Sequence, residues 1–131
     1  MEKTLVLLKP EIVKRGLMGK LISIYEEKGL TVEEMKLILP TRELLEEHYA
    51  EHKEKPFFES LVEYMSSGKV CAMEIQGEGA IQIVRTLNGK TNPLEADAGS
   101  IRGRFALSKS VNAVHSSDSP ESAERELNLW F

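Results

Sequence analysis

The sequence predicts an α/β fold, an α+β sandwich in which a four-stranded antiparallel sheet is covered by helices. Short apolar or alternating runs of strand length recur four times along the chain. Segments with apolar residues at helical spacing lie between them, and Gly or Pro marks most of the boundaries. At 131 residues the chain suits one hydrophobic core, so we expect a single domain over residues 1–131.

The first three elements alternate between strand and helix. Residues 4–9, TLVLLK, form an apolar run that ends at Pro10, which predicts a buried strand whose last residue, Lys9, emerges at an edge. Apolar residues recur every three or four positions over 17–28, so this segment predicts a helix. Residues 30–40 are rich in strand formers and alternate in polarity, which predicts a second strand.

The middle of the chain adds two helices, a strand and another helix. Residues 42–53 and the segment 56–68 both carry apolar residues at helical spacing. The run 69–77 alternates with period two and predicts a third strand, in which Cys71 is a small buried hydrophobe rather than a reactive thiol. Residues 79–89 predict a helix that ends at an Asn-Gly pair.

The last third begins with a segment, 91–106, that has little periodicity and predicts a long loop of functional importance. A short strand is expected over 111–115. Ser119 can cap a final helix that has Pro120 in its first position. The order of elements favours a ferredoxin-like sandwich, βαββαβ, although periodicity alone leaves other small α/β sheets open.

Composition and charge restrict the partners. No run approaches the roughly 20 apolar residues of a membrane span, no signal peptide is readable, and Cys71 cannot pair within the chain, so we expect a cytoplasmic protein. A net charge of −4 argues against stable nucleic-acid binding. Residues 85–109 nevertheless hold five basic and two acidic side chains, which indicates a small polyanion as ligand.

Phosphate binding would have to rely on side chains. The chain has no GxxxxGK motif, and the GEG turn at 77–79 lacks the third glycine of a dinucleotide-binding loop. Lys9, Arg85 and Arg102 come from separate segments and could together neutralise a polyphosphate. Sequence alone leaves open whether they converge.

A zinc site is a competing interpretation. HYAEH at 48–52 matches the inverted zinc-protease motif, because His48 and His52 would lie one turn apart on a helix beside Glu51. A third ligand would be needed for a catalytic zinc ion, and the short chain offers little room for a protease cleft. The motif can also arise by chance on a charged helix.

The histidine in NAVHSSD, His115, is the candidate nucleophile. A neutral imidazole attacks phosphorus without help from a separate base, and a phosphohistidine passes its phosphoryl group on. Glu126, on the final helix, could hold one ring nitrogen and leave the other free. From the local sequence alone, a role for His115 as a turn or cap residue also stays open.

Five ordered segments closely resemble the nucleoside diphosphate kinase family. They are TLVLLKPE, HYAEH followed by PFF, the GEGAI turn with VRTLNGKTNP, GSIRGRFA, and NAVHSSD with the helix after it. Together they extend over essentially the whole chain. The resemblance implies the ferredoxin-like core and transfer of a γ-phosphate from a nucleoside triphosphate to a nucleoside diphosphate by a ping-pong route through phosphohistidine, with broad base and sugar tolerance.

The resemblance also assigns roles to individual residues. It implies that His115 is the nucleophile, that Glu126 and Ser117 hydrogen-bond around it, and that Phe57 stacks on the base. Lys9, Tyr49, Arg102 and Asn112 resemble the family's phosphate, active-site and ribose contacts, and Arg85 and Thr91 resemble the residues that hold the β-phosphate. The resemblance further implies Mg²⁺ bound mainly through nucleotide phosphates, with no protein metal site, and a homo-oligomer, either a tetramer or a hexamer.

The chain departs from the family pattern at two positions, one near the region of subunit contacts and one directly after the histidine. Arg104 follows Ile-Arg-Gly where the family typically has Asp, and Ser116 follows the histidine where glycine is common. Two alternatives to the kinase stay open at this point: a non-catalytic nucleotide-binding module on the same fold, and the zinc hydrolase built on His48, Glu51 and His52.

Overall fold

The computed structural model describes residues 1–131, and its four strands form one antiparallel sheet. The strands are β1 (Glu2–Leu8), β2 (Thr31–Ile38), β3 (Val70–Gly77) and β4 (Val114–Ser116), in the spatial order β2-β3-β1-β4. Each neighbouring pair is antiparallel. The predicted four-stranded antiparallel sheet is therefore confirmed, with β2 and β4 at its two edges.

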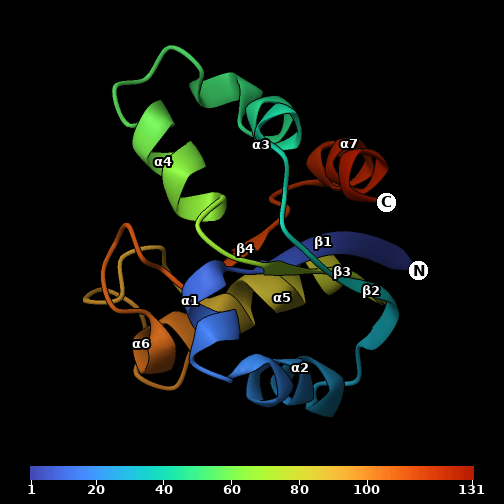
Figure 1. Cartoon of the computed structure of the whole chain (residues 1–131). Helices are drawn as coiled ribbons and strands as arrows, with labels where there is room; N and C mark the ends of the chain where they lie inside the picture. The colour runs from blue at the N-terminus through green and yellow to red at the C-terminus, as the bar shows by residue number, and fades with distance from the viewer.

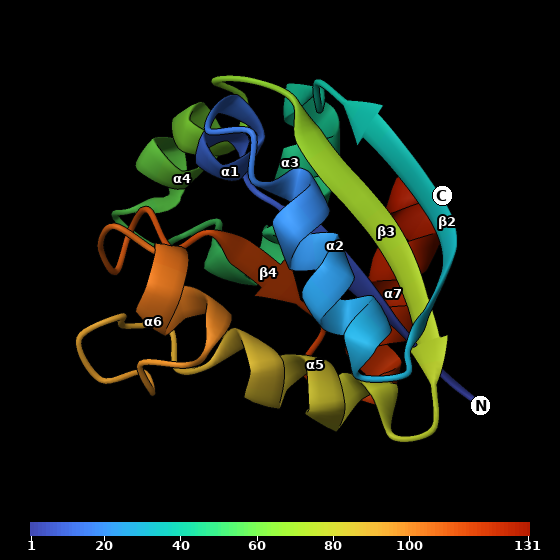
Figure 2. The ribbon, with the colours of Figure 1, turned by 90° about the horizontal axis from the view of Figure 1, so that it is seen from below.

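Helices cover both faces of this sheet (Figure 1). On one face lie α1 (Pro10–Lys14), α2 (Met18–Glu27) and α5 (Ala80–Asn88), and Figure 2 shows α2 and α5 from that side. On the other face lie α3 (Arg42–His48), α4 (Phe58–Met65) and α7 (Pro120–Trp130). The short helix α6 (Ile101–Phe105) lies near β4 (Figure 2). None of the helices combines the length and apolar character that crossing a bilayer requires.

The central strand β1 separates two hydrophobic cores. Val6 and Leu8 belong to the core beneath α2 and α5, whereas Leu5 and Leu7 belong to the core beneath α3, α4 and α7. All four side chains are fully buried, which explains why β1 reads as a continuous apolar run rather than an alternating one. The edge strand β4 pairs with β1, and this pairing places His115 opposite Leu7.

Two short helices were not predicted from the sequence. Pro10 does not only end the first strand, since it also occupies the first turn of α1. The prediction of a loop throughout 91–106 is wrong, because α6 begins after Ser100, whose Oγ accepts a hydrogen bond from the Gly103 amide. Helices of five residues are too short to show a periodic apolar pattern.

The predicted helix over 42–53 and the predicted strand over 111–115 need correction. The helix ends at His48, and the separate 3₁₀ turn Ala50–His52 follows, so His48 and His52 do not share one face of a continuous helix. The strand β4 begins at Val114, because Ala113 before it has a φ angle of 77° that does not fit a strand.

Candidate active site

A polar pocket of about 370 Å³ opens at the β4 edge of the sheet. Only two of its sixteen lining residues are hydrophobic. The chain folds so that segments from both ends and the middle meet here. Eight of the predicted site residues line the pocket: Lys9, Tyr49, Arg85, Thr91, Arg102, Asn112, His115 and Glu126.

The His115 ring is held through one of its two nitrogens. Its Nε2 lies 3.0 Å from Glu126 Oε1, and the Ser117 hydroxyl donates to the same oxygen at 2.7 Å. Ser117 is fully buried and its Oγ accepts from the Leu5 amide at 3.2 Å, which ties this group to β1. Because Nε2 donates to the carboxylate, Nδ1 carries the lone pair of the neutral imidazole.

Glu126 stays ionised in this environment. Burial acts to raise the pKa of this carboxyl, but the hydrogen bonds from His115 and Ser117 outweigh burial and lower the pKa. Glu126 faces the pocket from the middle of α7, a helix that begins with the Ser119 cap. An anionic oxygen fixed beside Nε2 both orients the ring and stabilises positive charge on it.

His48 packs against the His115 ring as a neutral side chain. The two ring centroids are 4.7 Å apart in an edge-to-face arrangement. Trp130 Nε1 donates to His48 Nδ1 at 3.0 Å. Burial, followed by the neighbouring His115, lowers the pKa of His48 to about 3. The neutral ring therefore limits the rotation of His115 without adding charge to the site.

Lys9 is buried in the pocket wall rather than emerging at an exposed edge. It follows β1 directly, only 6% of its surface is exposed, and its Nζ donates to Asn112 Oδ1 at 2.7 Å. Burial, and then the charge of Arg102, lower the pKa of Lys9 to about 8. The ammonium ion is thus poorly solvated, and an anionic ligand would compensate for this.

Arg102 connects three segments of backbone around the site. Its Nε donates to the Asn112 carbonyl, its Nη1 to the Gly89 carbonyl and its Nη2 to the Val114 carbonyl. A guanidinium has five N–H donors, so two remain to face an anion. Arg85 of α5 and Thr91, just after that helix, line the same wall.

The backbone before His115 adopts an unusual conformation that a carboxylate stabilises. Ala113 has a φ angle of 77° and is fully buried. Its amide donates to Glu11 Oε1 at 2.8 Å, and the other carboxylate oxygen of Glu11 accepts from the Tyr64 hydroxyl. Glu11 on α1 therefore fixes the turn that leads into β4.

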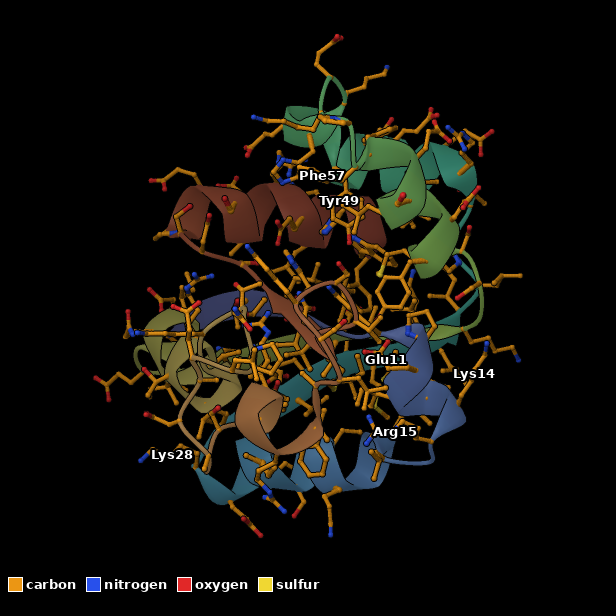
Figure 3. All side chains as sticks on the ribbon, turned by 90° about the vertical axis from the view of Figure 1, so that its left-hand side faces the viewer. Glu11, Lys14, Arg15, Lys28, Tyr49 and Phe57 are labelled. Carbon is orange, nitrogen blue, oxygen red and sulfur yellow. The ribbon has the colours of Figure 1, made fainter.

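The aromatic side chains are arranged from the pocket outward. Tyr49 is nearly buried and lines the pocket, and its ring lies 6.4 Å from the His52 ring, which in turn lies 5.5 Å from the ring of Phe57. Phe57 is 49% exposed and does not line the pocket. In Figure 3, Tyr49 and Phe57 lie together on the α3–α4 side and Glu11 lies across from them on α1.

Sequence reasoning missed several residues that line the pocket. Arg125 on α7 donates to the carbonyls of Glu47 and His48 and so ties α7 to the end of α3. Asp118 accepts a hydrogen bond from Ser122 that lowers the pKa of its carboxyl. Asp118 lies within the recognised NAVHSSD stretch, but nothing in the sequence marks Arg125, because its partners lie 77 and 78 positions away.

The residues of the proposed zinc motif are not arranged as a metal site. His48 Nδ1 already accepts from Trp130, and the neutral ring that results carries its proton on Nε2. The side chains whose ligand atoms gather within 4.8 Å are His48, His115 and Glu126, and His52 is not among them. Of the motif residues, His48 therefore packs against His115, and His52 packs against Tyr49 and Phe57 instead.

Comparisons with known proteins place this geometry in one family. The family model described as nucleoside diphosphate kinase matches residues 2–131. The chain is 53% identical to the nucleoside diphosphate kinase of an Exiguobacterium strain, covering 100% of this chain and 94% of that protein. It is 55% identical to the enzyme of the same name from Archaeoglobus fulgidus, at 100% and 87% coverage.

Solved structures of nucleoside diphosphate kinases resemble this chain over almost its whole length. The crystal structure of the apo nucleoside diphosphate kinase from Encephalitozoon cuniculi superimposes with a TM-score of 0.98 at 44% identity, covering 100% of this chain and 89% of that one. The Aquifex aeolicus nucleoside diphosphate kinase gives a TM-score of 0.96 at 41% identity, with 99% and 94% coverage.

Proposed function

The chain belongs to the nucleoside diphosphate kinase family, and from this we propose that His115 carries a phosphoryl group between two nucleotides. The enzyme transfers the γ-phosphate of a nucleoside triphosphate to a nucleoside diphosphate by a ping-pong mechanism. The observation that carries the assignment to His115 is its position in a cation-lined pocket, with Nε2 bound to Glu126.

The first half-reaction forms a nitrogen–phosphorus bond. The lone pair on His115 Nδ1 attacks the γ-phosphorus, the bond from phosphorus to the bridging oxygen breaks, and the nucleoside diphosphate leaves with that electron pair. The ring becomes positively charged, and Glu126 stabilises this charge through the proton on Nε2. In the second half-reaction a terminal phosphate oxygen of another nucleoside diphosphate attacks the phosphohistidine and restores the neutral ring.

Positive side chains neutralise the phosphates during both steps. Lys9 and Arg102 converge on the pocket next to His115, and Arg85 and Thr91 line the wall assigned to the β-phosphate. Phosphoryl transfer needs little from a protein beyond positioning and electrostatic stabilisation. Asn112, whose side-chain oxygen accepts a hydrogen bond from Lys9, is proposed to contact both the ribose and the phosphates.

Magnesium fits a site of this kind when it enters on the nucleotide. The carboxylates of the pocket are few, and Glu126 is already bound to His115 and Ser117, so the protein offers no cage of oxygen ligands. The other two carboxylates of the pocket lining, Glu51 and Asp118, are exposed, and either could contact the ion through water. When bound, the ion would neutralise part of the charge of the nucleotide phosphates.

The base is proposed to stack on Phe57, outside the pocket proper. This ring is half exposed, and its neighbour His52 reaches the pocket lining. Stacking on an aromatic face does not read the edges of a base, so it suits an enzyme that accepts several bases.

We further propose that the chain is a single-domain, cytoplasmic homo-oligomer, a tetramer or a hexamer. Exposed apolar side chains on and after the edge strand β2, namely Met35, Leu37 and Leu39, support association. The buried free cysteine is compatible with a reducing compartment. Sedimentation velocity distinguishes the two assemblies.

Labelling with γ-³²P-ATP in the absence of an acceptor tests the function. We expect acid-labile, base-stable label on the wild-type chain, none on His115→Ala, and release of the label when GDP is added. Label that survives the His115→Ala change would refute the assignment. Nucleotide binding without any label would instead identify a non-catalytic binding module.

A further inference from the structure

A row of three polar side chains crosses the core from α2 to the wall of the active-site pocket. Tyr25 and Asn88 are fully buried, and Ser116 is 8% exposed. The Tyr25 hydroxyl donates to Asn88 Oδ1 at 2.5 Å, and Asn88 Nδ2 donates to Ser116 Oγ at 3.1 Å. Nothing in the transfer steps described above uses this row.

The direction of these hydrogen bonds leaves the hydroxyl proton of Ser116 without an acceptor in the protein. Burial raises the pKa of Tyr25, so its hydroxyl keeps its proton and donates. The short contact suits an O–H···O bond and the longer one an N–H···O bond, in agreement with the orientation of the Asn88 amide. Ser116 Oγ therefore accepts from Asn88, and its own O–H donates to no protein group in the structure.

The Ser116 hydroxyl lies among groups that bind anions. A second cavity of about 380 Å³ adjoins the active-site pocket, and none of its lining residues is hydrophobic. Four residues line both cavities: Arg85, Thr91, Arg102 and Ser116. An unused donor that shares these cavity walls with two arginines and a threonine is placed to meet a phosphate oxygen.

We propose that the Ser116 hydroxyl donates a hydrogen bond to the β-phosphate of the bound nucleotide, and that Asn88 and Tyr25 position it. The proposal rests on the proposed function, since it deepens the phosphate site of that reaction. Glycine, common after the histidine in the family pattern, has no side chain to make this contact. In this chain, the Asn88 amide and the Tyr25 phenol position an additional hydrogen-bond donor, the Ser116 hydroxyl, for a phosphate oxygen.

Binding of ADP and AMP to the unphosphorylated enzyme, measured by calorimetry with magnesium present, tests the contact. Loss of one hydrogen bond to a charged group should weaken ADP binding by about tenfold in Ser116→Ala. AMP binding should not change, because AMP has no β-phosphate. Ser110→Ala, an exposed serine outside the pocket, is the matched control and should behave as the wild type in both titrations.

Unchanged ADP binding by Ser116→Ala, or an equal loss for AMP, would overturn the proposal. Normal labelling of His115 alongside either result would leave the kinase assignment intact and remove only this contact. Absence of label in the wild-type chain would instead remove the proposed function, so the two failures are distinguishable.

A double-mutant cycle tests the positioning role of Asn88. If Asn88 acts by orienting Ser116, Asn88→Ala should lower ADP affinity about as much as Ser116→Ala, and combining the two should add little. Losses that add fully in the double variant would overturn the positioning role. Tyr25→Phe, which removes only one oxygen, provides a second cycle if Asn88→Ala does not fold, with the same expectation of non-additivity.

Discussion

Glu126 is the residue on which the geometry of His115 depends most directly. One of its oxygens accepts from both His115 Nε2 and Ser117 Oγ, so a single carboxylate fixes the tautomer, the ring orientation and the local charge. Lys9 shows the complementary case, in which burial of a cation leaves it in need of an anionic partner. Each residue has a protonation state that its neighbours set, and each gives a prediction that kinetics or binding can check.

Replacing Glu126 by Gln should slow formation of the phosphohistidine by about 10–100-fold, the range typical when a carboxylate partner of a functional histidine is lost. The amide can still accept from Nε2 but cannot stabilise the positive ring. Rapid-quench measurement of a single turnover with magnesium and ATP gives the rate. Glu124→Gln, an exposed residue on the same helix, is the control, and equal rates in the two variants would contradict this role.

Nucleotide affinity should fall as the pH rises through the region of the Lys9 pKa, about 8. Below that pH the side chain is an ammonium ion that attracts phosphate, and above it the neutral amine attracts phosphate less. ADP titrations between pH 7 and 9.5 should show the affinity decrease in the wild type and a weaker decrease in Lys9→Arg, because arginine stays charged. Identical pH profiles for the two proteins would argue against a charge role for Lys9.

Short connections between elements determine where the site residues stand. The turn at Ala113 brings β4 to the sheet edge, and Glu11 from α1 holds the turn through the Ala113 amide. The segment at 91–106 has a similar role, since α6 within it directs Arg102 towards three backbone carbonyls. At this scale the site is built by contacts between elements rather than within them.

Glu11→Ala should therefore destabilise the fold by about 1–3 kcal/mol, the cost of leaving a buried amide without an acceptor. Urea denaturation monitored by circular dichroism measures the change. Glu26→Ala on the exposed face of α2 is the matched control and should change stability little. A Glu11 variant as stable as this control would show that the contact with Ala113 is dispensable.

For the whole molecule, the sequence predicts the sheet and most helices, but it does not predict the contacts between elements that are far apart in the chain. The apolar run of β1 and the capped start of α7 are local signals, and the structure contains both. The 3₁₀ turn after His48 and the short helices α1 and α6 leave no periodic signal, so they were missed. Trp130 and His48 lie 82 positions apart, so only the folded chain shows that His48 packs against both Trp130 and His115.

The same limit applies to the candidate site. The resemblance picked out eight residues that converge on the pocket, together with Ser117 behind Glu126, because each lies in a recognisable segment. It could not indicate the burial that lowers the pKa of Lys9, or the row from Tyr25 to Ser116, since both arise from packing between distant elements. The convergence of Lys9, Arg85 and Arg102 from separate segments on one pocket is a further result of packing between distant elements.

The position of the phosphoryl group on the imidazole ring tests the central claim most directly. NMR of the phosphoenzyme, prepared from ATP with ¹⁵N-histidine labelling, identifies which ring nitrogen of His115 is bonded to phosphorus. Because Glu126 holds Nε2, we expect phosphorus on Nδ1 and a proton on Nε2. Phosphorus on Nε2, or on a residue other than His115, would contradict the account.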